Sequence, residues 1–385
     1  MINFHKISKL CRLLNIKYPI IQAGMSGPST IDLVSAVSNA GGVGVLGADS
    51  YSSKQLRNSI RKIKTKTSFP FGINLLIPNK GTFQAKQYIQ VQNLLNDIRR
   101  DINIDIISDP NKIIPFTNAN EKIDDEITSE KIDIILEEKV PLISFGLGDP
   151  TPFVKTIHDS DTTTKIMTMV STVDEALHVA KNGVDIIIAQ GSEAGGHRST
   201  LQTHKVPPLI GTVSLIPQMV DSLSKEANND DGKESIPVIA SGGITDGRGL
   251  AAAVCLGASG VSIGTRFLLA KESSVFKAYR EKLLRAKETD VVITNTFSGI
   301  PARAIKNKII KKFENSKINP LPWPIQWTIA EDIYKACFVN NNIEYYPLLA
   351  GQSIRLLTRE QTASEIVKEI IKEFENIISN LKNSN

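Results

Sequence analysis

Cysteine is scarce in this sequence, and long apolar runs are missing. The three cysteines, Cys11, Cys255 and Cys337, lie far apart and form no C-x-x-C pair. This spacing argues against a disulfide framework and a structural zinc site, and it fits a reducing compartment. No apolar run approaches the roughly 18 residues that a membrane helix needs. We therefore expect a cytoplasmic protein with no metal site and no membrane partner.

The sequence also lacks strong charge clusters and low-complexity tracts. Its formal net charge of +5 is spread along the chain, and lysines often alternate with acidic residues on the expected helices. Such a pattern is weak evidence for nucleic-acid binding, which we do not expect. Residues 1–17 contain several basic residues and no acidic one, as transit peptides do. Because a core strand is expected to begin at Tyr18, little would remain to cleave.

Nucleotide-binding motifs are absent or poorly placed. The phosphate-binding pattern G-x-x-x-x-G-K-[ST] does not occur. Residues 42–47 match G-x-G-x-x-G, but the dinucleotide motif should follow a strand and open a helix. Here the glycines follow an expected helix and lie inside the next strand. We therefore do not interpret them as a dinucleotide site.

Short apolar segments alternate with segments of helical spacing through the first 270 residues. The expected strands span 18–23, 43–46, 70–77, 141–148, 165–170, 184–189, 236–240 and 260–265. Eight strand–helix units in sequence predict an α/β protein with a (β/α)8 TIM barrel over residues 1–270; a doubly wound sheet is the alternative. The pattern loosens over about 79–138, which we interpret as an elaboration.

Residues 271–385 do not continue the repeat, because 321–324 are too rich in proline. The terminal helix has an apolar stripe, and Thr362 and Glu365 have capping-box spacing at its start. We expect a smaller α-rich extension that packs across the barrel as a lid over the active site. For Trp323 and Trp327 we favour core packing over covering a pocket mouth.

The most informative stretch is residues 190–198, which follow the expected strand 184–189. Three glycines in six residues allow close approach of a ligand, and they precede His197, a side chain suited to proton transfer near neutral pH. Among the five histidines, His197 follows a strand end, where barrel catalysis is concentrated. His204 is the reserve candidate. The alternative is a tight turn with an exposed histidine, and we expect Glu193 to be solvated.

Two further strand ends carry small residues, 241–243 and 262–265. In barrels, loops after the last two strands commonly hold a phosphate with backbone N–H groups, although each could be a simple turn. Asn74 and Gln190 are amides at strand ends, able to donate and accept hydrogen bonds as a flavin's pyrimidine edge demands. Either amide could equally cap a turn.

Several of these segments together resemble nitronate monooxygenases, formerly called 2-nitropropane dioxygenases. The likeness runs from about Tyr18 to Ala270, and the Glu-Ala-Gly-Gly-His sequence at 193–197 is its specific element. The other matching segments are 18–25, 71–74, 144–146, 241–244 and 263–267, with further echoes at 298–303 and 350–352.

The resemblance implies an FMN-binding barrel over which a smaller domain closes, with His197 as the catalytic base. The residues that it places against FMN are Gln22, Gly24, Met25, Asn74, Gln190, Gly195, Gly196, Gly242, Gly243, Ser262, Ile263, Gly264 and Thr265. No metal ligand is implied.

The expected activity is the oxidation of alkyl nitronates, and of neutral nitroalkanes after proton removal, by FMN and dioxygen. The products are a carbonyl compound and nitrite, which suits a detoxifying role. One alternative is an FMN-dependent NAD(P)H reductase of quinones or an enoyl thioester. Another is a flavin-free barrel that binds a phosphorylated ligand. The oligomeric state stays open, with a homodimer as one option.

Overall fold

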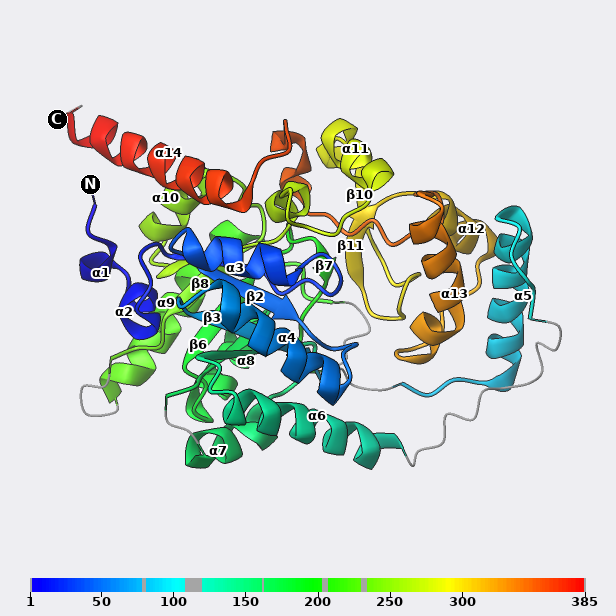
Figure 1. The fold of residues 1–385 in the computed structure, drawn as a ribbon, viewed down its shortest axis with the longest axis horizontal. Coiled ribbons are helices and arrows are strands. Elements are labelled where there is room, and N and C mark those ends of the chain that lie inside the picture. Colours follow the sequence, from blue (N-terminus) through cyan, green and yellow to red (C-terminus); the bar gives the residue numbers. More distant parts are fainter. Residues whose placement is uncertain are drawn as a thin grey trace.

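The computed structural model describes residues 2–77, 81–107, 120–160, 163–202, 207–229 and 234–383. A closed barrel of parallel strands occupies one side of the molecule (Figure 1). A smaller lobe of helices and a three-stranded sheet occupies the other.

In the described residues, eight parallel strands close the barrel in the order β1-β2-β3-β4-β5-β6-β8-β9. The ring closes where β1 pairs with both β2 and β9, so that Ile21 lies between Val43 and Ser262. This confirms the predicted (β/α)8 barrel and its eight strands; the doubly wound sheet is wrong. The strands are β1 Ile20–Gln22, β2 Val43–Gly47, β3 Phe71–Leu76, β4 Leu142–Gly146, β5 Lys165–Val170, β6 Ile186–Gln190, β8 Val238–Ser241 and β9 Gly260–Ile263.

Helices surround the barrel and connect its strands (Figure 1). They are α3 Ile31–Asn39, α4 Ser53–Lys66, α6 Asn120–Glu137, α7 Thr151–Ser160, α8 Val173–Lys181, α9 Thr212–Asn229 and α10 Gly247–Cys255. The terminal helix α14 (Ala363–Asn383) packs on α10 and α3, where an eighth barrel helix would lie. Its predicted capping box is present: Thr362 Oγ1 accepts the N–H of Glu365, whose carboxylate accepts the N–H of Thr362.

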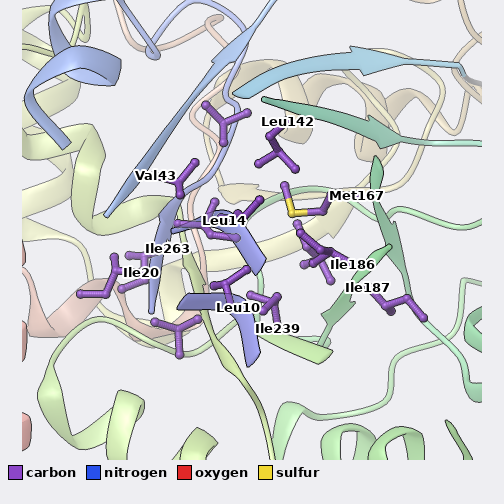
Figure 2. Close-up of a cluster of buried hydrophobic side chains, with 14 of the residues drawn as sticks. Leu10, Leu14, Ile20, Val43, Leu142, Met167, Ile186, Ile187, Ile239 and Ile263 are labelled. Carbon is purple, nitrogen blue, oxygen red and sulfur yellow. The ribbon is translucent and has the colours of Figure 1, made fainter. Parts of the chain in front are cut away.

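The amino-terminal segment packs at the end of the barrel where the strands begin, since Ser8 donates to the carbonyl of Ser259 and Leu10 lies against Gly260, the first residue of β9. It contains α1 (Phe4–Ile7) and α2 (Lys9–Leu14), and Ser8 caps α2 by accepting the N–H of Cys11. Leu10 and Leu14 are buried against strand residues such as Ile20 and Ile239 (Figure 2). Burying a leucine side chain contributes about 1.5–3 kcal/mol, so this segment belongs to the barrel core.

Glycines 42, 44 and 47 belong to strand β2 and its start, which explains the apparent dinucleotide motif. A Cβ on Gly44 would lie 2.1 Å from the carbonyl oxygen of Val34, because α3 packs directly on the strand. A Cβ on Gly47 would lie 2.6 Å from the backbone nitrogen of Ser26. The spacing therefore reflects close packing of the barrel wall.

The second lobe has its own apolar core. Helices α5 (Ala85–Asp101), α12 (Lys308–Ser316) and α13 (Ile325–Val339) contribute Tyr88, Phe313 and Ile329 to it. The buried Arg99 joins α5 to α13 by pairing with Asp332. In the described residues of the elaboration, two helices pack in different places: α5 packs in this lobe, and α6 packs on α4 of the barrel.

The lobe's remaining elements connect it to the barrel. Its three-stranded sheet has the order β10-β11-β7. These strands are β10 Val291–Thr294, β11 Ala302–Ile305 and β7 Gly196–His197. The other helical elements of the described residues after β9 are η1 Thr265–Leu269, α11 Lys277–Arg285, η2 Glu288–Asp290 and η3 Gln352–Leu356. Because β7 belongs to the loop after β6, the sheet joins the predicted catalytic loop to the lobe.

Candidate active site

A cavity of about 280 Å³ lies at the carboxyl ends of the barrel strands, between the barrel and the second lobe. Most of the predicted site residues line it. They are Gly24, Met25, Asn74, Gln190, Gly195, Gly196, His197, Gly242, Gly243, Ser262, Gly264 and Thr265. The structure therefore brings together residues from five segments that are distant in sequence.

Gln22 and Ile263 do not line the cavity. The buried amide of Gln22 donates to Ser29 Oγ at 2.8 Å and accepts the N–H of Val45 at 3.2 Å. Ile263 packs in the barrel core, and its carbonyl oxygen accepts the N–H of Ala23. Both residues support the wall of the site at the junction of β1 and β9.

His197 lies on a strand rather than in an exposed turn. Gly196 and His197 form β7, which pairs antiparallel with β11 so that His197 is opposite Ala302. The next residue continues the contact, because the N–H of Arg198 donates to the carbonyl of Pro301 at 2.8 Å. The imidazole is therefore held by backbone from the second lobe.

The imidazole environment favours the neutral ring. His197 Nε2 lies 2.7 Å from Ser298 Oγ, and the half-buried side chain is exposed to the cavity. Burial lowers the pKa of His197 from 6.5 to about 4, and the Asp49 carboxylate opposes this shift. At neutral pH the ring keeps one nitrogen lone pair, as a general base requires.

Two buried arginines hold the loop that precedes His197. Arg198 donates to the carbonyl oxygens of Gly191 at 2.6 Å and Gln190 at 3.0 Å, and burial lowers its pKa to about 10. Arg303, on β11, donates to the carbonyl of Ser192 at 2.6 Å. These bonds satisfy carbonyl oxygens that a tight loop would otherwise leave unpaired.

Glu193 is not solvated, contrary to our expectation. Its carboxylate accepts the N–H of Thr212 at 2.9 Å and the Thr212 hydroxyl at 2.9 Å. Thr212 is the first residue of α9, so the negative charge lies at a helix N-terminus, which stabilises it. Glu193 thereby ties the glycine-rich loop before His197 to α9.

The two predicted amides differ in what they bind. Gln190 is committed within the protein, because it donates to the carbonyl of His197 at 2.8 Å and accepts the N–H of Ser199 at 2.9 Å. The side chain of Asn74 has no hydrogen-bond partner among the described residues, and it faces the cavity. Asn74 is therefore the amide that remains available to a ligand.

Unpaired donors mark the end of the cavity between β8 and β9. The Ser262 hydroxyl is buried without a partner, which is costly unless a ligand supplies one. The N–H groups of Gly243 and Gly264 likewise have no acceptor within the described segments. Gly243 has φ +72°, a conformation that side chains rarely adopt. Such a set of donors suits an anion.

The outer cavity wall is aromatic. Trp323 and Trp327 both line it, together with Tyr279 and Tyr346, so core packing describes the tryptophans incompletely. Trp327 also packs on Tyr334 of the lobe core, with ring centroids 5.2 Å apart. The cavity is thus polar at the barrel end and apolar at the lobe end.

Several lining or supporting residues were not predicted from the sequence. Ser298 supports His197, and Asp49 follows β2. Gly351 directly precedes η3, and Ser353 lies in it. The segments 298–303 and 350–352, noted as echoes of the family, contain two of them, Ser298 and Gly351. Asp49 and Ser353 lie outside these segments.

The other histidines have different positions. His204 lies outside the described residues. His158 contacts Asp185 and His178 contacts Asp149, both away from the cavity.

No group of three metal-ligating side chains occurs in the described part of the chain. Across the same residues, no helix combines the length and apolar character required to cross a membrane.

Comparison with known proteins gives consistent matches along the chain. The family model for nitronate monooxygenase matches residues 7–373. A protein of Staphylococcus saprophyticus named "Probable nitronate monooxygenase" is 36% identical over 378 residues, covering 97% of this chain and 99% of that protein. A protein of the same name from Staphylococcus aureus is 36% identical over 373 residues, covering 96% and 98%.

Solved structures match over similar lengths. Nitroalkane oxidase from Streptomyces ansochromogenes has a TM-score of 0.82 at 27% identity, covering 97% of this chain and 99% of that chain. FabK from Thermotoga maritima has a TM-score of 0.73 at 28% identity, covering 98% and 99%.

Proposed function

Because this chain belongs to the nitronate monooxygenase family, we propose that it oxidises alkyl nitronates with bound FMN and dioxygen, giving a carbonyl compound and nitrite. The family makes the chain an oxidoreductase; the cofactor, the substrate and the residue roles are our proposal. The observation that carries it is a neutral imidazole, His197, on the wall of a cavity whose other end has unpaired hydrogen-bond donors.

The residues of the cavity fit FMN. The Ser262 hydroxyl and the N–H groups of Gly243 and Gly264 would hold the phosphate, since each lacks a partner within the described residues. The side-chain amide of Asn74 would bind the polar edge of the ring system. FMN, when bound, supplies electron transfer and reactivity with dioxygen, for which protein side chains are poorly suited.

His197 would handle the proton when the substrate is a neutral nitroalkane. Because Nε2 contacts Ser298, base chemistry requires the tautomer in which Nε2–H donates to the serine oxygen. The lone pair of Nδ1 is then free to accept the α-proton. The Ser298 hydroxyl would turn to the carbonyl of Ile300, which is 3.5 Å away. Asp49 would favour the imidazolium that forms.

The second lobe would keep water away from the reacting groups. Its sheet holds His197, and its aromatic side chains form the outer wall of the cavity. A low-dielectric wall strengthens the electrostatic interactions inside. A base whose pKa is this low removes protons weakly. A preformed nitronate needs no proton removal, so we expect the enzyme to turn it over faster than the corresponding neutral nitroalkane.

An absorption spectrum of the purified protein, followed by two assays, tests the proposal. We expect a flavin spectrum, oxygen uptake with ethylnitronate, and anaerobic bleaching of the flavin by ethylnitronate. Bleaching by NADH in place of ethylnitronate would favour the reductase alternative. A colourless protein after gentle purification would favour a flavin-free barrel.

A variant tests the role of His197. His197→Asn should lose turnover of nitroethane by about 10²–10⁴-fold, the usual contribution of a general base, and keep turnover of ethylnitronate. Unchanged turnover of nitroethane would remove the base assignment.

A further inference from the structure

Methionine is concentrated at the candidate active site. Of the five methionines in the sequence, Met1 lies outside the described residues. Met25, Met167 and Met169 line the cavity, whereas Met219 belongs to α9 and packs in the barrel core. A thioether packs well in an apolar wall, and it is also the group that peroxides convert to a sulfoxide. The cavity therefore gathers oxidisable side chains around the site at which we propose that dioxygen reacts.

Exposure separates these methionines. Met167 is 1% exposed and Met219 is 0% exposed, so both are shielded by packing. Met25 and Met169 are half-buried, and they lie near the carboxyl ends of β1 and β5. Because β5 lies opposite β1 in the ring of strands, their side chains reach the cavity from opposite sides. Among the described methionines, these two are the most accessible to a small oxidant.

Met25 differs from Met169 in what surrounds it. Its side chain packs against both the barrel core and the apolar cluster formed by η1, α11 and η3. Its backbone is fixed by Ser29, whose hydroxyl accepts the N–H of Met25 at 2.8 Å. Its Sδ would lie 3.7 Å from a Cβ on Gly264, whose N–H has no acceptor within the described segments. An oxygen added to this sulfur would therefore lie beside Gly264, which we assign to the cofactor phosphate.

We propose that Met25 is a modification site, at which hydrogen peroxide forms methionine sulfoxide and thereby weakens flavin binding. The modification concerns the methionine alone, whereas its consequence rests on the proposed function, because that names the ligand. Peroxide is the two-electron reduction product of dioxygen, which the proposed reaction uses.

The oxidation step balances without a further reactant. The sulfur lone pair attacks one oxygen of hydrogen peroxide, and an S–O bond forms as the O–O bond breaks. The second oxygen leaves as hydroxide and takes the proton from the first, which gives water. The sulfur loses two electrons and the peroxide gains them. Methionine sulfoxide reductases reverse the change, so the site can act as a switch.

A sulfoxide at Met25 opposes flavin binding in two ways. It places a polar group where a thioether packs on two apolar clusters, which disturbs that packing. Its oxygen is also a hydrogen-bond acceptor, and it would compete with a phosphate for the N–H of Gly264. We expect the dissociation constant of the flavin to rise on the order of tenfold, the usual effect of a misplaced polar group.

A map of oxidation rates tests the modification site in the wild type. The purified protein, with its cofactor as isolated, is incubated with millimolar hydrogen peroxide. Peptide mass spectrometry then follows the gain of one oxygen at each methionine. We expect Met25 to be oxidised at least about tenfold faster than Met219, the buried control, because packing excludes the oxidant from a core side chain. Equal rates at the two methionines would show that the proposal is wrong.

Flavin release tests the consequence. After the same treatment, ultrafiltration separates bound from free flavin, and each protein is compared with its own untreated sample. We expect the wild type to lose flavin in proportion to its Met25 sulfoxide and to bind flavin again after treatment with methionine sulfoxide reductases. Met25→Leu removes the oxidisable sulfur at similar volume and should retain the flavin that it had before treatment. Met169→Leu, the matched control on the opposite side of the cavity, should lose as much flavin as the wild type.

The two measurements separate this inference from the proposed function. If complete oxidation of Met25 leaves the flavin content unchanged, the switch is wrong although the proposed function stands. A protein that is isolated without flavin and does not bind added FMN would remove the proposed function and the flavin switch together. The rates at Met25 and Met219 would then still decide whether the cavity contains a modification site.

Discussion

Protonation of His197 should destabilise the folded protein in acid. Its pKa falls from 6.5 to about 4 on folding, because the charged ring would be buried. The unfolded chain therefore binds a proton at a higher pH than the folded chain does. The contribution of the neutral ring to stability is complete above pH 6.5 and is lost as the pH falls toward 4. The loss amounts to about 2 kcal/mol at pH 5 and about 3 kcal/mol at pH 4.

The comparison with His197→Asn isolates this effect, because asparagine does not titrate. We expect the difference in unfolding free energy between wild type and variant to shift by about 2 kcal/mol in favour of the variant between pH 7 and pH 5. Urea denaturation at equal cofactor occupancy measures it, and Trp323 and Trp327 on the cavity wall report it by fluorescence. If the unfolding free energies of wild type and His197→Asn changed equally with pH, the reasoning would be refuted. The imidazole would then be equally easy to protonate in the folded and the unfolded chain.

Three further substitutions have distinct expected results. Ser298→Ala removes the partner of the imidazole and should lower kcat/KM for nitroethane about tenfold while leaving ethylnitronate unaffected; equal losses on both substrates would contradict a role in positioning the base. Glu193→Gln should lower the free energy of unfolding by about 1–2 kcal/mol in thermal denaturation, because the charge-assisted bonds to Thr212 weaken. Gly195→Ala should reduce flavin content, since its Cβ would lie 2.5 Å from the backbone of the 350–351 segment. Gly211→Ala, whose Cβ would have its nearest neighbour at 3.5 Å, is the matched control and should keep its flavin.

The barrel was predictable because its determinants are local. Each strand is a short apolar run bounded by turn residues, and eight such runs in series leave few topologies. The position of α14 beside α3 and α10 was harder to predict, because an apolar stripe shows that one face of a helix is buried but not which elements cover it. The packing of α5 in the second lobe was also not predicted, because its partners, α12 and α13, lie more than 200 residues away in sequence.

The lining of the cavity was predictable where its residues follow strand ends. The glycine-rich loop before His197 and the small residues after β8 and β9 all follow strands, and they meet because parallel strands end at one face of a barrel. Ser298 was not identified as a partner of His197, because 101 residues separate them. The prediction that Glu193 is solvated was wrong for a similar reason. Its carboxylate accepts the N–H of Thr212 at the start of α9, which lies 19 residues later in the sequence.

The loop of residues 191–197 is joined to the second lobe by several contacts. Strand β7 completes the β10-β11 sheet, Arg303 of that sheet holds Ser192, and Gly195 packs against the 350–351 segment. The barrel alone would therefore present His197 on a loop without its pairing strand and without Ser298. Placing a base within a few tenths of an ångström requires supporting groups that are themselves rigid. If His197 is the base that we propose, the lobe is a structural part of the catalytic site, and substitutions at its contacts with residues 192–197 should lower turnover even when flavin content is unchanged.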